Sequence, residues 1–194
     1  MIWWPALWFY KNFCVKIIYM TELFNPKTVV AQLNISPGLV VADFGCGGGY
    51  FTIEVAQVVG DNGKVFAIDV VPENLESIRS LAKIKGLNNI ETRWANLEKT
   101  STLDFNICDR VIIINLLFQV EKKLHYRIFE EAYNVLKKGG QLTVIDWKPE
   151  SLLGPPKNTR LSLEEAITMA QKANFNFIKT LEIDDAHWCA IFQK

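Results

Sequence analysis

Short apolar runs alternate with amphipathic segments along most of the chain, from residue 25 to the C-terminus. Runs rich in β-branched and aromatic residues, each followed by a turn or helix signal, predict strands at 39–44, 64–69, 90–94, 110–115 and 141–147. Gly86 and Gly139 stand where left-handed C-caps are expected, and helical spacing predicts helices at 49–59, 72–85 and 122–137. This alternation predicts an α/β fold in which helices cover a parallel sheet and right-handed crossovers set the winding.

The C-terminal part changes character after a loop at 148–161. Ser162 and Glu165 have the spacing of a capping box, which predicts a helix that runs to about residue 173. Two further apolar runs, 175–183 and 187–193, are joined by a short turn. Such a short connection permits only an antiparallel hairpin, so the sheet is expected to end mixed.

The first twenty residues differ from the rest because aromatic side chains crowd together there and acidic residues are missing. Lys11, Asn12 and Lys16 interrupt this stretch, which argues against a membrane-spanning helix. The lysines also follow the first aromatic cluster, whereas a signal peptide places its positive charges first. Three interpretations stay open: a helix packed on the domain, an amphipathic helix in peripheral contact with a membrane, or an extension upstream of a true start at Met20. The predicted division is an aromatic-rich extension at 1–20 and a single domain at 21–194.

The charge and cysteine content exclude several broad classes of protein. A chain of 194 residues suits one domain of ordinary size. The 21 Lys and Arg residues balance the 21 Asp and Glu residues, so no overall basic field attracts nucleic acid, and no nucleic-acid partner is expected. The four cysteines are widely spaced and form no CxxC pair, so we expect no metal site and no disulfide framework. Reduced thiols and a cytoplasmic location are predicted.

The segment VVADFGCGGGYFT, residues 40–52, carries the sharpest chemical signal in the sequence. Asp43 lies near the end of the predicted first strand, and Gly45, Gly47 and Gly49 follow before a helix. Glycine lets the chain turn tightly as it leaves the sheet and lets a ligand lie against the backbone. Free amides at the helix N-terminus then favour a negatively charged group, such as a carboxylate or phosphate.

The spacing of this loop distinguishes between kinds of nucleotide. A dinucleotide site expects Gly or Ala at the sixth position counted from Gly45, but that position is Tyr50. Asp69 ends the second predicted strand, twenty residues after Gly49, where its two oxygens can accept both hydroxyls of a ribose. The arrangement therefore favours a nucleoside ligand without a pyrophosphate.

Together these motifs resemble the class I S-adenosylmethionine-dependent methyltransferases, specifically the small methyltransferase domains of quinone biosynthesis. The resemblance covers roughly residues 24–194 and rests on DFGCGGG (43–49), AIDVVPE (67–73), ANLE (95–98), DRVIIINLLFQ (109–119) and LKKGGQLTVIDWKP (136–149). It implies a Rossmann-like, seven-stranded, mostly parallel sheet of order 3-2-1-4-5-7-6, with helices on both faces and a C-terminal antiparallel hairpin. It also implies that S-adenosylmethionine binds over the carboxyl ends of the first two strands, and that 21–194 is a methyltransferase domain.

The resemblance implies roles for the first matching positions. Gly45, Gly47 and Gly49 line the methionine part of the cofactor, and Asp43 lies close to its ammonium group. Asp69 holds the ribose hydroxyls. A local alternative stays open for Asp69, which also has the position of a charge at the N-terminus of the following helix.

The remaining matching positions lie nearer the adenine and the methyl group. The resemblance implies that Val70 packs on the adenine and that Asn115 and Leu116 flank the methyl group. Asn96 stands where the family usually has Asp, which accepts a hydrogen bond from the adenine amino group. The Asn carbonyl still accepts, although a charge-assisted bond is lost. A plain turn residue is the alternative for Asn96.

Residues on the acceptor side follow from the topology, because ligands of open α/β sheets bind outside the carboxyl ends of the strands. His187 is the first candidate for a general base and Asp146 the second, with a structural histidine at a hairpin edge as the alternative. His125 is expected to be solvated. Arg160 is expected either to bind a carboxylate or phosphate of the substrate or to be a surface charge.

The expected function is methyl transfer from S-adenosylmethionine to a small or hydrophobic acceptor by in-line displacement, a reaction that depends chiefly on positioning. Two alternatives stay open. One is an S-adenosylmethionine-binding protein without catalysis. The other is a nicotinamide-dependent oxidoreductase, against which Tyr50 and Asp43 argue.

Overall fold

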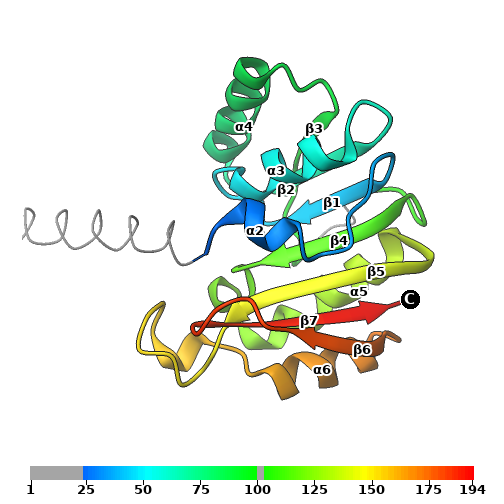
Figure 1. The fold of residues 1–194 in the computed structure, drawn as a ribbon. Helices are drawn as coiled ribbons and strands as arrows, with labels where there is room; N and C mark the ends of the chain where they lie inside the picture. Colours follow the sequence, from blue (N-terminus) through cyan, green and yellow to red (C-terminus); the bar gives the residue numbers. More distant parts are fainter. Residues whose placement is uncertain (1–23, 100–102) are drawn as a thin grey trace, which may run out of the picture.

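The computed structural model describes residues 24–99 and 103–194 (Figure 1). The predicted extension at 1–20, with Cys14 and the start proposed at Met20, lies outside the described residues. The described strands are β1 (Val40–Phe44), β2 (Lys64–Asp69), β3 (Ile90–Trp94), β4 (Cys108–Ile114), β5 (Leu136–Trp147), β6 (Asn176–Leu181) and β7 (His187–Gln193). The helices are α2 (Pro26–Val30), α3 (Tyr50–Val59), α4 (Pro72–Lys85), α5 (His125–Val135) and α6 (Leu163–Lys172), with short 3-10 turns η1 (Leu117–Gln119), η2 (Lys122–Leu124) and η3 (Lys157–Thr159). None of the described helices has both the length and the apolar character that a bilayer span needs.

The strands form one twisted sheet in the order β3-β2-β1-β4-β5-β7-β6 (Figure 1). Strands β1 to β5 pair in parallel, whereas β7 runs antiparallel to both β5 and β6. The predicted strand order and the C-terminal antiparallel hairpin are therefore confirmed. In this topology the carboxyl ends of β1, β2 and β4 meet at one edge of the sheet.

Alternate residues of the central strands pack on opposite layers of helices. Val41 of β1 lies in a buried cluster with Val55 of α3. The next residue, Ala42, lies in a separate cluster with Phe129 of α5 and Ala166 of α6. Successive side chains of a strand point to opposite faces, so this two-sided core confirms that helices cover both faces of the sheet.

The connection between α5 and β5 differs from the prediction of a helix at 122–137. Helix α5 ends at Val135, and Leu136 already begins β5. Gly139 has the expected left-handed φ of +79°, but it lies within β5 instead of capping a helix, and its amide donates to the carbonyl of Lys194. Leu136 is completely buried and pairs with Cys108 of β4. Because of this burial the strand already starts at Leu136, before the polar Lys-Lys-Gly-Gly segment.

Local signals for helix ends agree with the structure elsewhere. Gly86 caps α4 with a φ of +67°, as predicted. The capping box of Ser162 and Glu165 is present at the start of α6. Helix α2 was missed, although its signal is in the sequence: Asn25 accepts hydrogen bonds from two amides of the first turn, and Pro26 occupies the first helical position.

Candidate active site

The glycine-rich loop joins β1 to α3 at the carboxyl edge of the sheet. The amides of Gly45 and Cys46 both donate to the carbonyl of Ile68, which ties the loop to β2. Gly47 and Gly49 have φ values of +50° and +81°, a region that side chains rarely adopt. A Cβ at Gly47 would meet no atom within 4 Å, whereas one at Gly49 would lie 2.4 Å from Cγ1 of Ile78. Gly47 thus leaves space for a ligand, and Gly49 allows α3 to approach α4.

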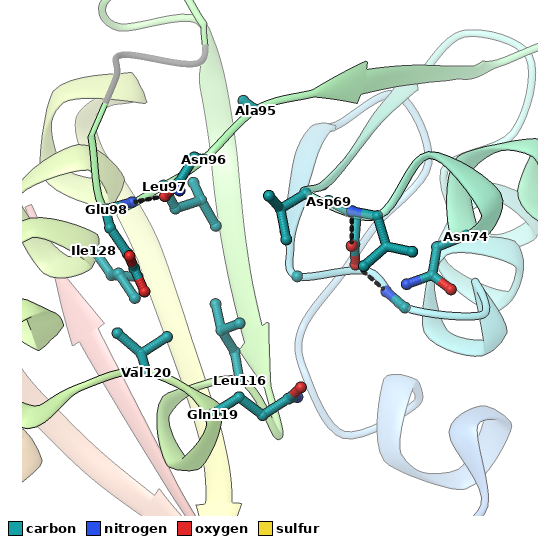
Figure 2. A pocket seen from close by; sticks show the side chains of 14 residues that line it. Asp69, Asn74, Ala95, Asn96, Leu97, Glu98, Leu116, Gln119, Val120 and Ile128 are labelled. Carbon is teal, nitrogen blue, oxygen red and sulfur yellow. Dashed lines mark hydrogen bonds between the residues drawn. The ribbon is translucent and has the colours of Figure 1, made fainter.

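Asp69 ends β2 and connects the glycine-rich loop with the start of α4. One carboxylate oxygen accepts from the amide of Gly47 and the other from the amide of Val71, both at 2.8 Å (Figure 2). Val71 is the N-cap residue of α4, so the local role considered for Asp69 is also present. Each carboxylate oxygen retains a further lone pair for a ligand hydroxyl.

A cavity of about 250 Å³ opens between this loop and the connections that follow β3 and β4. Asp69 and Asn74 lie on one side of it; the side opposite mixes the apolar side chains of Leu97, Leu116, Val120 and Ile128 with polar ones from Asn96, Glu98 and Gln119 (Figure 2). The lining residues are Gly45, Gly47, Asp69, Val70, Val71, Asn74, Ala95, Asn96, Leu97, Glu98, Leu116, Gln119, Val120 and Ile128. Such a lining of apolar side chains with a few polar groups is typical of small-molecule sites.

Five of the residues implied for cofactor binding line this cavity, namely Gly45, Gly47, Asp69, Val70 and Asn96. Sequence reasoning missed several polar neighbours. Asn74 lies in the first turn of α4, and Glu98 and Gln119 lie in the loops after β3 and β4. The signal for Asn74 is its place five residues after Asp69, at the start of the helix that follows β2.

Asn96 shapes the loop after β3 as well as lining the cavity. Its side-chain oxygen accepts a hydrogen bond from the amide of Glu98 at 2.9 Å (Figure 2). The turn role considered for Asn96 is therefore present.

Asp43 lies behind the glycine-rich loop and does not line the cavity. Its side chain is buried, and the hydroxyl of Thr52 donates to it at 2.6 Å. Burial raises the pKa of Asp43 to about 7; the Thr52 hydrogen bond opposes this rise and the charge of Asp69 adds to it. A cationic ligand group near the loop would favour the ionised form of Asp43.

The raised pKa of Asp43 is expected to make the protein less stable as the pH rises. The folded state retains a proton that the unfolded state, with the ordinary pKa of 3.8, has already released. This stabilisation is complete below the unfolded pKa and is lost as the pH rises through about 7. Urea unfolding should show a loss of about 2 kcal/mol between roughly pH 5 and pH 7. Asp43→Asn stays neutral and should lack most of this slope; an unchanged slope in the variant would contradict the assignment.

On the acceptor side, His187 begins β7 beside the end of β5. Its ring is buried between Phe24, at a centroid distance of 4.3 Å, and Trp147, at 4.1 Å. Nδ1 lies 2.8 Å from a carboxylate oxygen of Asp184, and Nε2 lies 3.4 Å from the amide nitrogen of Asn115. Burial lowers the pKa of His187, and Asp184 acts in the opposite direction. Neither His187 nor Asn115 lines the cavity, although Leu116, the next residue after Asn115, does.

Asp146, the second candidate base, is completely buried at the end of β5. Its oxygens accept from the amides of Leu117 at 2.9 Å and Trp147 at 2.8 Å. Burial raises its pKa to about 6 against the effect of these hydrogen bonds. The carboxylate thereby holds the loop after β4, which forms one wall of the cavity. This geometry favours a structural role, and the role of Asp146 as a base stays a prediction.

The expectation that His125 is solvated is wrong. His125 is completely buried, and its Nε2 lies 2.8 Å from the carbonyl of Leu117 and 2.9 Å from that of Val120. Two carbonyl acceptors require a proton on this nitrogen. His125 shares one helical face with Ile128 and Phe129, three and four residues later, and that spacing was the available signal.

Neither role expected for Arg160 is found. Arg160 is only 5% exposed, and its guanidinium donates to backbone carbonyls of the loop that precedes it. The acceptors are the carbonyls of Lys148, Pro149, Ser151, Leu153 and Pro155. The loop turns its carbonyls inward, and five fixed N–H donors are what can satisfy so many of them.

Replacing Arg160 with lysine is therefore expected to lower the free energy of unfolding by about 2 kcal/mol, because an ammonium leaves several buried carbonyls unpaired. Urea unfolding measures this loss. Arg127→Lys is the matched control, since the Arg127 side chain is 63% exposed and should tolerate the change. Equal stabilities of the two variants would contradict the structural role of Arg160.

Comparison with known proteins agrees with this geometry. A family model described as "Methyltransferase domain" matches residues 35–192. The chain belongs to this family. Membership implies S-adenosylmethionine as the cofactor of the methyltransferase domain. The matched residues lie within the predicted domain at 21–194, whose division from 1–20 stays a prediction.

Individual relatives support the same family. The domain is 30% identical over 122 residues to an arsenite methyltransferase of Halobacterium salinarum, covering 63% of this chain and 30% of that protein. It is 28% identical over 128 residues to a demethylmenaquinone methyltransferase of Geobacillus stearothermophilus, covering 66% and 53%. The chain thus spans about half or less of these curated relatives. A solved S-adenosylmethionine-dependent methyltransferase from Aquifex aeolicus superposes with a TM-score of 0.81 at 26% identity, covering 90% of this chain and 92% of the other.

Proposed function

We propose that this domain transfers the methyl group of S-adenosylmethionine to a small or hydrophobic acceptor. The observation that carries the proposal is the cavity at the ends of β1 and β2, where the Asp69 carboxylate lies across from the apolar side chains of Leu97 and Leu116 (Figure 2). A nucleoside needs both features, since its ribose offers two hydroxyl donors and its base offers a flat apolar face. Family membership supplies the reaction type.

The residues present fit this cofactor. Gly47 leaves open the space that a Cβ would fill, beside an Asp69 carboxylate with lone pairs to spare. In the proposal Asp69 holds the ribose hydroxyls, while Gly45, Gly47 and Gly49 shape the loop for the methionine part. Asp43 supports the ammonium group from behind the loop.

The adenine is assigned to the apolar residues that line the cavity. Val70 packs on one face of the base, and Leu97 and Leu116 offer further apolar contacts. Asn96 is assigned to the adenine amino group, for which an amide oxygen is a suitable acceptor. Asn115 lies next to Leu116 at the end of β4 and is assigned to the methyl end of the cofactor.

Positioning is the main catalytic contribution that we assign to these residues. The bound cofactor supplies a methyl group already activated on a sulfonium, so a nucleophile held in line at about 3 Å gains much of the required barrier reduction. A general base is needed only for an acceptor that must lose a proton. His187 is the proposed base, because its pKa is lowered and its ring is oriented by Asp184. Asp146 is second, since both of its oxygens are already engaged.

The acceptor class follows from the surroundings of the site. Leu152 and Leu153 are exposed in the loop after β5, near the carboxyl edge of the sheet. The balanced charge offers no field for a polyanion. The demethylmenaquinone methyltransferases among the relatives carry in their name a hydrophobic acceptor, which supports a similar class here. A reduced naphthoquinone is therefore the first acceptor to test.

Calorimetry and a transfer assay test the proposal. S-adenosylmethionine and S-adenosylhomocysteine should both bind, and labelled S-adenosylmethionine should methylate 1,4-dihydroxynaphthalene kept under reducing conditions. Absence of cofactor binding at millimolar concentration would contradict the proposal. Binding without product on this and other hydrophobic acceptors would instead indicate a cofactor-binding protein without catalysis.

A further inference from the structure

Three polar side chains, two from the start of β7 and one from the end of β4, lie in a row at the carboxyl edge of the sheet. Asp184 precedes β7, His187 begins β7, and Asn115 follows β4. Strand β5 brings them together, because Trp147 at its end pairs with His187 and Ile145 accepts from the amide of Asn115.

Asp184 determines which ring nitrogen of His187 carries the proton. One Asp184 oxygen accepts from the backbone amides of Ala186 at 2.8 Å and His187 at 2.7 Å. The ring Nδ1 lies 3.0 Å from that oxygen and 2.8 Å from the other. A carboxylate only accepts hydrogen bonds, so Nδ1 is the protonated nitrogen. The buried ring is neutral, since its pKa is lowered, and Nε2 is left with a lone pair.

The lone pair on Nε2 in turn orients the side chain of Asn115. Nε2 lies 3.4 Å from the amide nitrogen of Asn115, which is the half of the carboxamide that donates. The carbonyl oxygen of Asn115 is therefore turned away from the ring. This oxygen is buried and has no hydrogen-bond partner among the described residues. A buried acceptor without a partner costs free energy, and a ligand that supplies the missing donor would remove that cost.

We propose that Asp184 and His187 are positioning residues that hold the carboxamide of Asn115, so that its oxygen accepts a hydrogen bond from the O–H or N–H nucleophile of the methyl acceptor. This inference rests on the proposed function and refines it. This assignment replaces the role of general base for His187, because its Nε2 faces Asn115 and not the acceptor. Two neighbours of Asn115 place it beside the cavity. Leu116 lines the cavity, and the side chain of Gln119, another lining residue, donates to the backbone carbonyl of Asn115.

Nitrogen NMR of the full chain labelled in histidine tests the geometry without any substrate. The chain has two histidines, and the structure gives them opposite tautomers: a proton on Nδ1 of His187 and on Nε2 of His125, which faces two carbonyls. In Asp184→Asn the new amide group faces the ring, so the proton of His187 should move to Nε2 and the oxygen of Asn115 should turn toward it. Asp185→Asn, at the exposed neighbouring position, should change neither tautomer. A proton on Nε2 of wild-type His187, or an unchanged tautomer in Asp184→Asn, would overturn the inference.

A matched pair of ligands tests the contact itself. With S-adenosylhomocysteine bound, wild type should bind 1-naphthol about tenfold more tightly than 1-methoxynaphthalene, which lacks the donor. Asp184→Asn and Asn115→Gly should lose this preference, and Asp184→Asn, whose side chain is assigned to neither ligand, should retain the affinity for S-adenosylhomocysteine. Glycine suits position 115 because φ there is +54°. A preference that is absent in wild type, or that persists in both variants, would overturn the inference. Failure of S-adenosylhomocysteine to bind wild type would instead overturn the proposed function, and the tautomer measurement would still decide the geometry.

Discussion

Replacing Asp69 with alanine is expected to lower the affinity for S-adenosylhomocysteine at least about a hundredfold, because two hydrogen bonds from ribose hydroxyls to a charged acceptor are lost. The same carboxylate also accepts hydrogen bonds from the amides of Gly47 and Val71. The backbone segments beside the proposed ribose position therefore lose these two hydrogen bonds as well. Asp69→Asn should bind almost as weakly. Its amide group must face one of those two backbone N–H donors, and two donors repel each other.

Calorimetry with S-adenosylhomocysteine, together with circular dichroism to verify the fold, measures the effect of the Asp69 substitutions. Glu73→Ala is the matched control, because Glu73 is an exposed acidic residue in the first turn of α4 and does not line the cavity. It removes a neighbouring negative charge without removing an acceptor from the site. Retained affinity in folded Asp69→Ala would remove this residue from the cofactor site.

Gly49→Ala is expected to destabilise the protein by about 3–5 kcal/mol, since overpacking and an unfavourable φ add together. Its Cβ would lie 2.4 Å from Cγ1 of Ile78 on the packed face of α4, and φ at this position is +81°. Gly47→Ala should lose only about 1 kcal/mol, because its Cβ meets no atom within 4 Å and the φ of +50° is the sole strain. It should nevertheless weaken cofactor binding, since the new methyl group enters the cavity.

Urea unfolding and calorimetry separate the two glycine variants. Ile78→Ala combined with Gly49→Ala removes the clashing carbon, so the double variant should be more stable than the sum of the single losses indicates. Additive losses would show that the contact with Ile78 does not explain the glycine. Equal stabilities of Gly47→Ala and Gly49→Ala would contradict the division of roles within the loop.

The fold was largely predictable because most of its signals are local. Each central strand is an apolar run ended by a turn signal, and Gly86 and Ser162 stand at helix ends as their chemistry requires. The strand order came from the resemblance to a family and not from these patterns. The prediction failed at 136–140, where burial of Leu136 against β4 outweighs the helix-forming character of the lysines.

In the candidate site, too, the residues with local signals were predicted and the others were not. The glycine-rich loop and Asp69 were predicted because the glycines come directly after the first strand and Asp69 ends the second, so both can be recognised from a few neighbouring residues. His125 and Arg160 were misjudged because a polar side chain is buried only when other segments supply its partners. For His125 these are the carbonyls of the loop after β4, and for Arg160 those of the loop after β5.

By itself, the sequence determined an α/β sheet, a glycine-rich turn after its first strand and an acidic residue at the end of its second, because periodicity and backbone constraints act over a few residues. Tertiary structure alone decided that Asn74 and Gln119 line the same cavity as Asp69, and that His187 reaches Asn115. Such placements depend on strand pairing and on competition for buried hydrogen bonds between segments far apart in the chain, which no local pattern records.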